Sequence, residues 1–200
     1  MPKPLRHLPL FEIKEHAEGY LLVPLEVARA REPLPTTQLS KIWLAPEVHR
    51  YFFSEMVPIL QVELKKQKQV VAAFLYGSRA RGDALSNSDF DIGLLCEKYP
   101  TLNIRNEIGD SLNQALAAQL KVVQDRGSRT ELSVQFFSTQ VDLDTIAPIY
   151  YSIGLDHAML WQREKKGEEY FSRLTRIMKK QDVKSVGQGK TRQWRWRNLG

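Results

Sequence analysis

Apolar residues recur at two different periods along this chain, and the longer period predicts helices. Between residues 46 and 68 they return at spacings of three and four, which is typical of an amphipathic helix. Pro46 suits the first turn of that helix, whereas Pro58 is expected to kink it or split it in two. Residues 103–127 repeat the helical period and end at Gly127, a residue suited to a C-cap.

Short apolar runs predict strands between these helices. The predicted strands cover residues 70–77, 89–96 and 130–138. The first run, VVAAFLYG, is continuous and rich in β-branched and aromatic residues, as expected of a strand buried on both faces. Three more elements follow: a short helix over 142–154, a short strand or connector over 157–162, and an amphipathic helix over 168–180. This order predicts an α+β (mixed α/β) fold, a small mixed sheet flanked by helices.

The two ends of the chain have a different composition from the middle. Eight of the ten prolines precede residue 60, and Pro24 restricts any strand within 18–30 to an edge or interrupted element. We therefore predict an N-terminal extension of unknown role over residues 1–45, a main domain over 46–178, and a tail over 179–200.

The tail carries the basic character of the protein. It holds seven basic side chains against one acidic one, a surplus equal to the net charge of +6, so residues 1–178 are neutral overall. Without apolar periodicity, the tail is expected to be disordered. Its WRWR sequence at 194–197 interleaves aromatic and cationic residues as single-strand binders do, so nucleic-acid binding is expected only through this segment, if at all.

Composition excludes several classes of protein. No apolar run approaches the ~20 residues of a membrane helix, so no membrane partner is expected. The N-terminal residues lack the apolar core of a secretory signal, and the single cysteine, Cys96, rules out an internal disulfide. These features predict a cytoplasmic protein.

The most distinctive chemistry lies in FLYGSRARGDALSNSDFDIGLL, residues 74–95. Asp89 and Asp91 alternate with apolar residues in a strand, so both carboxylates project from one face. Neighbouring carboxylates repel unless a cation neutralises them, and Mg²⁺ binds carboxylate and phosphate oxygens together. Upstream, Gly77 and Ser78 end a buried strand, where backbone N–H groups can approach an anion. The pattern therefore predicts a site for a metal-bound polyphosphate, with Arg79 and Arg81 available to contact the same phosphates.

Simpler interpretations explain less of this pattern. Asp-x-Asp alone is common on solvated strands, and Gly-Ser alone is a generic turn. The glycines of GSRARG have the spacing of a P-loop, but Asp83 and Ala84 stand where Lys and Ser/Thr are required. The tail sequence GQGKT resembles the same motif, but no strand precedes it and Lys184 occupies the first glycine position.

This segment resembles the signature of the nucleotidyltransferase superfamily that includes DNA polymerase β. The signature consists of a buried strand, Gly77-Ser78, ten intervening residues and then Asp89-Phe90-Asp91. GSRARG and SDFDI are most similar to the minimal nucleotidyltransferases (MNT). The resemblance implies a nucleotidyltransferase fold over residues 46–178 and two Mg²⁺ ions held by Asp89 and Asp91. It also implies that Gly77 and Ser78 bind the β- and γ-phosphates of ATP or another NTP, and that a nucleoside monophosphate passes to an acceptor.

Members of this family add a third carboxylate from the next central strand, as metal ligand and base. Glu131 is our candidate, because ELSV stands where the family often has DLVV. Gln135 lies on the same strand face four residues later and is the alternative. If Gln135 is the equivalent position, the third carboxylate is missing.

The resemblance implies a hydroxyl acceptor and leaves its identity open. MNT proteins often act as antitoxins that adenylylate helical HEPN toxins, so a HEPN-type partner protein is one expected acceptor. Antibiotic-type nucleotidyltransferases, which modify small molecules, usually have a larger C-terminal helical domain, whereas only one good helix is predicted after the core here. A catalytically inactive nucleotide- or partner-binding module of the same fold is the remaining alternative.

Overall fold

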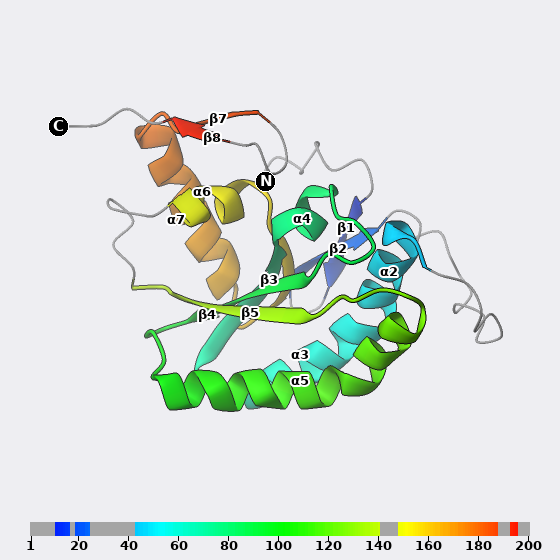
Figure 1. Ribbon diagram of the computed structural model, residues 1–200. Coiled ribbons are helices and arrows are strands. Elements are labelled where there is room, and N and C mark those ends of the chain that lie inside the picture. The colour runs from blue at the N-terminus through cyan, green and yellow to red at the C-terminus, as the bar shows by residue number, and fades with distance from the viewer. Residues whose placement is uncertain (1–10, 17–18, 25–42, 141–147, 188–192, 196–200) are drawn as a thin grey trace.

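Four strands form one mixed sheet in the computed structural model, which describes residues 11–16, 19–24, 43–140, 148–187 and 193–195 (Figure 1). In sheet order the strands are β5 (Leu132–Ser138), β4 (Phe90–Cys96), β3 (Val70–Tyr76) and β6 (Ala158–Gln162). Strand β3 is antiparallel to both β4 and β6, whereas β4 is parallel to β5. The predicted small mixed sheet and the three core strands are confirmed.

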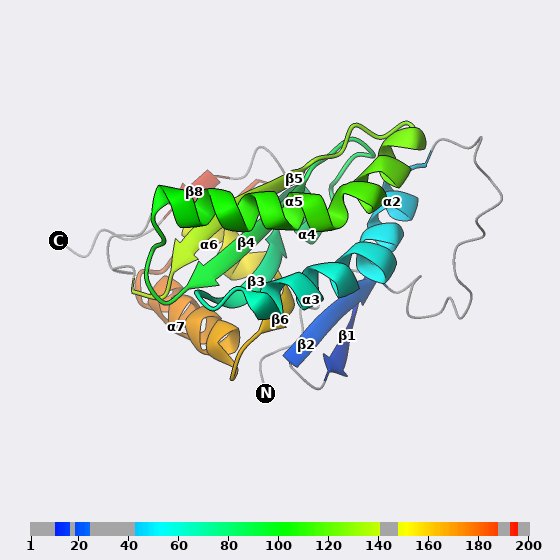
Figure 2. The same cartoon turned by 90° about the horizontal axis from the view of Figure 1, so that it is seen from below.

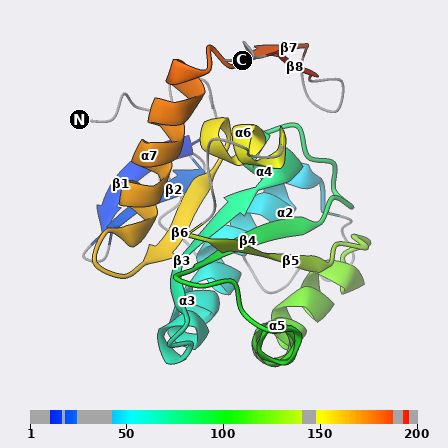
Figure 3. The same cartoon turned by 90° about the vertical axis from the view of Figure 1, so that its left-hand side faces the viewer.

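The two central strands are buried on both faces because helices cover each side of the sheet (Figure 3). This explains the continuous apolar run of β3, in which only the last residue, Tyr76, is partly exposed. The lower layer contains α2 (Ala45–Tyr51), the π-helix η1 (Phe52–Met56), α3 (Val57–Lys66) and α5 (Leu102–Asp125). The upper layer contains α6 (Pro148–Leu155) and α7 (Lys166–Lys180).

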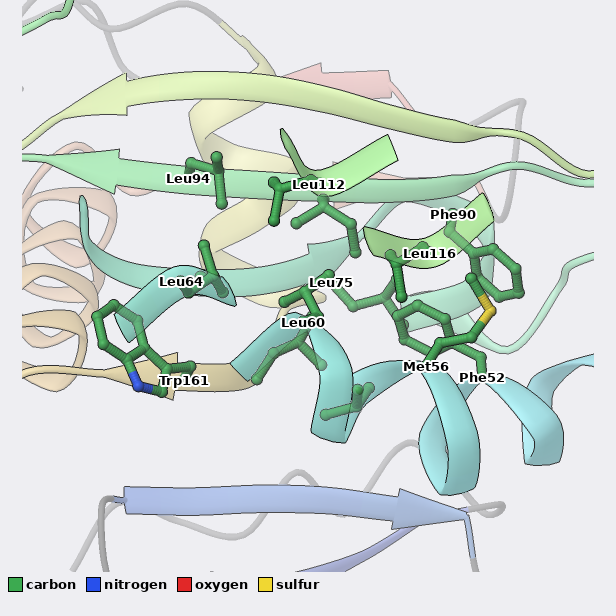
Figure 4. Packing of buried hydrophobic residues seen from close by; sticks show 14 of the residues in the cluster. Phe52, Met56, Leu60, Leu64, Leu75, Phe90, Leu94, Leu112, Leu116 and Trp161 are labelled. Carbon is green, nitrogen blue, oxygen red and sulfur yellow. The ribbon is translucent and has the colours of Figure 1, made fainter. Parts of the chain in front are cut away.

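The larger core lies between the sheet and the lower helices (Figures 2 and 4). Leu60 and Leu64 of α3 and Leu112 and Leu116 of α5 are fully buried there, as their helical spacing predicts. The ring of Phe90, at the start of β4, stacks on Phe52 with a centroid distance of 4.2 Å. This packing fixes the strand on which the candidate carboxylates lie.

The predicted first helix is divided at the position of its proline. Pro58 lies in the first turn of α3, directly after the π-helix Phe52–Met56. A proline supplies no N–H and its ring crowds the carbonyl four residues earlier, so a wider π turn at this place relieves the conflict. The expected break therefore takes the form of a change of helix type.

The N-terminal strands form a separate hairpin. Strand β1 (Phe11–His16) pairs antiparallel with β2 (Gly19–Pro24), and β2 runs beside β6 at the edge of the sheet. Strand β2 ends at Pro24, in agreement with the restriction expected from that residue. The sequence pattern did not predict β1.

The basic tail is more ordered than we predicted. Strands β7 (Lys184–Val186) and β8 (Gln193–Arg195) pair antiparallel, and the indole of Trp194 lies 5.6 Å from the ring of Tyr151 in α6. The expectation of disorder is therefore wrong for these six residues, because Trp194 anchors them to the folded domain.

In the described part of the chain, no helix is both long and apolar enough to span a membrane.

Candidate active site

Asp89 and Asp91 lie together where strand β4 begins. Phe90 and Ile92 point into the core and are fully buried, so the alternation of β4 turns Asp91 to the opposite face, partly open to solvent. Asp89 precedes the strand and is exposed. Burial, and then the charge of Asp89, raise the pKa of the Asp91 carboxyl, while Arg81 and Arg79 oppose the shift. The pair is thus electrostatically strained in the way that a bound cation relieves.

Gly77 packs directly against this carboxylate pair. Strand β3 ends at Tyr76, which is the register partner of Asp91, and the short helix α4 (Gly77–Arg81) follows at once. Gly77 has a φ of +73°, and a β-carbon at this position would lie 2.1 Å from Oδ2 of Asp91. Only glycine combines this backbone conformation with such a close approach. The turn and the carboxylates therefore form one continuous surface, with Ser78 next along it.

The residues on this surface fit a hard divalent cation held jointly with a polyphosphate. Carboxylate oxygens are the ligands that Mg²⁺ prefers, and it usually takes one or two of them together with water and phosphate oxygens. Within the described ranges, no three His, Cys, Asp or Glu side chains are grouped so that they alone could hold a metal ion. The donor set is therefore typical of a site that a metal and a nucleotide complete together.

Glu131 lies beside Asp89, one residue before strand β5. Its backbone N–H donates to Oδ1 of Asp89 at 3.0 Å, and its carbonyl accepts from the N–H of Phe90 at 2.9 Å. The parallel register pairs Phe90 with Leu132 and Gly93 with Gln135. Of the two candidates for a third carboxylate position, Glu131 is thus next to the Asp89–Asp91 pair, whereas Gln135 is further along the sheet. The Glu131 side chain is exposed, and its role stays a prediction.

The two arginines of the motif have different positions. Arg81 is partly exposed and contacts Asp83, with Nη2 3.2 Å from Oδ1, and it lies close enough to Asp91 to lower the pKa of that carboxyl. Arg79 is fully buried, and its guanidinium donates to protein oxygen atoms below the turn. Our expectation that Arg79 contacts phosphate needs correction, because its side chain points into the protein and not into solvent.

Two further residues border the carboxylates and were not predicted from the sequence. Tyr76 faces Asp91 across the β3–β4 pair, and burial, followed by the Asp91 charge, raises the pKa of its hydroxyl to about 12. Ser133 is exposed and is the register partner of Asp91 on β5. The alternation of Glu131, Ser133 and Gln135 placed Ser133 on the correct face, but only the register between strands places it beside Asp91.

Comparison with known proteins agrees with this geometry. Residues 60–143 match the family described as "Polymerase beta, Nucleotidyltransferase". The matched segment contains Gly77, Ser78, Asp89, Asp91 and Glu131. No curated protein matches the chain.

Several solved structures are similar to the chain at low identity. One belongs to a toxin–antitoxin crystal structure with AMP-PNP: identity is 17%, coverage is 62% of this chain and 87% of the other, and the TM-score is 0.41. Another belongs to a tri-AMPylated Shewanella oneidensis HEPN toxin in complex with an MNT antitoxin, with 14% identity, 62% and 85% coverage, and a TM-score of 0.39. A third, from the toxin–antitoxin MntA-HepT, has 14% identity, 62% and 86% coverage, and a TM-score of 0.40. Such values assign neither a partner nor a substrate to this chain.

The mixed sheet, the Gly77–Asp91 contact and the family match all concern the same segment. Residues 60–143 of this chain therefore match the polymerase β nucleotidyltransferase family over the segment that carries the candidate site.

Proposed function

We propose that this protein is a Mg²⁺-dependent nucleotidyltransferase that transfers a nucleoside monophosphate, with AMP as first choice, from an NTP to a hydroxyl acceptor. The observation that carries the proposal is the contact between Gly77 and Asp91, since a β-carbon on Gly77 would lie 2.1 Å from Oδ2 of Asp91. A phosphate at the Gly77–Ser78 turn and a cation on the carboxylates would then be immediate neighbours. The polyphosphate would then bridge the two halves of the site.

Each residue has a definite task in this reaction. The backbone N–H groups at Gly77 and Ser78, and the hydroxyl of Ser78, would hold the β- and γ-phosphates. Asp89 and Asp91 would hold the metal, two ions by family resemblance, which neutralises charge on the phosphates when bound. Arg81 would leave Asp83 and contact the same phosphates, since it is the partly exposed arginine of the motif.

The bond changes define the role of Glu131. The acceptor oxygen forms a bond with the α-phosphorus while the α–β phosphoanhydride bond breaks, and pyrophosphate leaves with the bonding electrons. The acceptor hydroxyl proton has to go to a base within hydrogen-bond reach. Glu131 is the carboxylate next to Asp89 and is exposed to solvent, so it is the candidate base and third metal ligand.

A hydroxyl on a partner protein is our preferred acceptor. It rests on the resemblance of GSRARG and SDFDI to the MNT sequences, whose members often modify HEPN-type partners. A small-molecule acceptor is less favoured, because within the described residues only one helix, α7, follows the last strand of the main sheet. That leaves little structure to enclose a free small molecule.

A nucleotide-binding module without turnover is the second candidate. It is favoured because Glu131 contacts Asp89 through its backbone N–H and not through its carboxylate. In addition, no group of three carboxylates that could hold a metal ion is present in the described ranges. The same site would then bind a metal–nucleotide complex and leave it intact.

Incubation with labelled NTPs separates these candidates. The protein is mixed with Mg²⁺, host lysate and each of ATP, CTP, GTP and UTP labelled in the α-phosphate, beside the Asp89→Asn/Asp91→Asn variant. We expect label on a macromolecular acceptor with wild type only. Equal labelling by the variant would overturn the catalytic assignment, whereas a wild type that binds nucleotide without transfer would favour the module.

A further inference from the structure

Arg79 is a buried cation with no ion pair to any carboxylate that the structure describes. Its relative exposure is 0%, and none of the described carboxylates lies within salt-bridge distance of it. Burial lowers the pKa of its guanidinium to about 10, partly offset by the nearby charges of Asp89 and Asp91, so the group is still cationic at neutral pH. A permanent charge inside a small domain therefore needs a structural explanation.

The guanidinium joins three segments that build the site. Nε donates to the carbonyl of Ser88 at 3.0 Å, and Nη2 donates to the same carbonyl and to the Thr130 hydroxyl, the latter at 3.2 Å. Arg79 itself belongs to α4, two residues after Gly77. Ser88 directly precedes Asp89, and Thr130 directly precedes Glu131.

Buried hydroxyl groups extend this network on the far side of the loop. The hydroxyl of Thr130 donates to the carbonyls of Ser86, at 3.0 Å, and of Ser88, at 3.2 Å, as alternative acceptors. Ser128 is also buried and its hydroxyl contacts both Thr130 and the Ser86 carbonyl. The backbone carbonyls of Ser86 and Ser88 thus tie the loop before Asp89 to Thr130 and Ser128.

Stability alone does not explain this arrangement. Nη1 of Arg79 is buried and has no hydrogen-bond partner among the described residues. A buried charge with an unmatched N–H is costly, and apolar replacements of such groups are often neutral or stabilising. The ring of Phe90 lies under the guanidinium at 4.2 Å, which offsets only part of that cost.

We propose that Arg79 is a positioning residue that sets the place of Asp89 and Asp91 relative to the Gly77–Ser78 turn, and thereby the affinity of the site for a metal–triphosphate complex. The inference rests on the proposed function, since it assigns that complex to this surface. Arg79 has no contact with substrate in this account. It acts through the Ser88 carbonyl and the Phe90 ring, on either side of Asp89.

The chain contains a matched control arginine. Arg163 donates to the carbonyls of Val70 at 3.1 Å and Lys65 at 2.9 Å, and its guanidinium lies 5.0 Å from the ring of Trp161. It has the same kind of contacts as Arg79, but it meets β3 at its first residue, the end away from Gly77. Loss of the hydrogen bonds made by the Arg163 guanidinium should reduce the stability of the fold without changing the candidate active site.

The test compares Arg79→Lys, Thr130→Val, their double variant and Arg163→Lys in the full chain. Lysine keeps the positive charge but lacks the planar set of N–H donors of the guanidinium. Valine at position 130 removes the hydroxyl and leaves the arginine in place. Calorimetry measures affinity for Mg²⁺ with whichever of ATP, CTP, GTP and UTP wild type binds best. Hydrogen exchange measures protection of residues 83–91, and thermal unfolding gives the stability of each variant.

We expect Arg79→Lys and Thr130→Val to weaken metal–triphosphate binding by roughly 10–100-fold, as loss of groups that orient metal ligands does. Exchange of residues 83–91 should accelerate in both. The double variant should bind about as weakly as Arg79→Lys alone, because both changes break one network. Arg163→Lys should lower the unfolding temperature while affinity and exchange of 83–91 stay at wild-type values.

Unchanged affinity in Arg79→Lys, or an equal loss of affinity in Arg163→Lys, would overturn the positioning role. Wild type that binds the metal–triphosphate complex and transfers nothing would overturn only the proposed function, since the comparison rests on binding. Wild type that binds no such complex would overturn both.

Discussion

The backbone of Gly77 lies against the carboxylate of Asp91, and a β-carbon on Gly77 would fall 2.1 Å from Oδ2 and 2.9 Å from Cγ of that side chain. The contact brings the end of β3 and the start of β4 together at one point of the sheet. The Asp91 carboxylate can keep this position only while position 77 has no side chain.

Gly77→Ala should therefore affect function more than folding. The left-handed conformation of residue 77 would destabilise the protein by about 1–2 kcal/mol, and the Asp91 carboxylate would rotate away from the new methyl group. Metal-dependent nucleotide binding and transfer should be lost. Gly109→Ala is the control, because it lies in α5 with nothing within 4 Å of its β-carbon, and it should stabilise the protein by about 0.5–1 kcal/mol. Wild-type nucleotide binding by Gly77→Ala would contradict the account.

Asp91→Asn should stabilise the metal-free protein at neutral pH. The pKa of Asp91 is raised in the folded state by burial and by Asp89, so ionisation above the ordinary aspartate pKa opposes folding. The unfolding temperature of the variant in EDTA should exceed that of wild type at pH 7, and the gain should disappear as the pH falls below about 4. Addition of Mg²⁺ and nucleotide should raise the unfolding temperature of wild type only. An Asp91→Asn protein less stable than wild type in EDTA would contradict this assignment.

Glu131→Gln tests the third carboxylate. As base and metal ligand, Glu131 should contribute roughly 10²–10⁴-fold to turnover, with a smaller effect on nucleotide binding. Gln135→Ala is the matched change on the same strand face, and turnover should stay within a few-fold of wild type. Single-turnover kinetics with bound nucleotide measure both. A larger loss of turnover in Gln135→Ala than in Glu131→Gln would assign the third-carboxylate position to residue 135, and the third carboxylate would then be missing.

His157 should make the fold sensitive to acid. Its ring stacks on Phe171 at 3.5 Å, its Nδ1 lies 2.7 Å from the Ile153 carbonyl, and burial lowers its pKa to about 4. A depressed histidine pKa stabilises the protein above the ordinary value of about 6.5, and this contribution declines as the pH falls from there toward 4. Between pH 7 and pH 5 the loss should be about 1–2 kcal/mol.

Denaturant unfolding at several pH values measures this effect. His157→Gln keeps a donor for Ile153 and lacks the titration, so its stability should fall less steeply over the same range. Parallel curves for the variant and wild type would show that His157 does not carry the acid sensitivity. His49, whose pKa burial lowers to about 3, would then be the next residue to change.

Trp194→Ala should release the C-terminal hairpin from the domain. Lys184 and Arg195 stand opposite each other in the β7–β8 pair, and like charges in such positions destabilise a hairpin. The ion pair of Lys184 with Asp182, at 3.2 Å, reduces this repulsion, and the contact of Trp194 with Tyr151 adds to the stability of the hairpin. Limited proteolysis should cleave the variant between α7 and residue 195 faster than wild type, with little change in the unfolding temperature. Equal cleavage rates would mean that other contacts hold the hairpin.

Local patterns were sufficient for the parts of the site that depend on strand alternation. The alternation of Asp89, Phe90 and Asp91 predicts that the carboxylates share a face, because a strand period of two is a local property. In the structure Asp91 turns away from the core, and the charge of Asp89 is near enough to raise its pKa. The helical period likewise predicted α5 within two residues at each end. Burial of β3 followed from its continuous apolar run.

Parts that depend on contacts between distant segments could not be predicted in this way. Arg79 and Arg81 both lie in the five-residue helix α4, too short for its own period to say which side chain is buried. The Ser86 and Ser88 carbonyls and the Thr130 hydroxyl, far along the chain, determine that Arg79 turns inward. Strands β7 and β8 have three residues each, and their order comes from the packing of Trp194 on α6.

The most direct test of the central claim is to determine which phosphate of the substrate is transferred to the product. Wild-type protein is incubated with Mg²⁺, host lysate and ATP labelled at either the α- or the γ-phosphate. Nucleotidyl transfer predicts label on the acceptor from α-labelled ATP alone, with γ-label released as pyrophosphate, and no labelling by Asp89→Asn/Asp91→Asn. Acceptor labelling from the γ-position, or α-labelling that persists without both aspartates, would contradict the account.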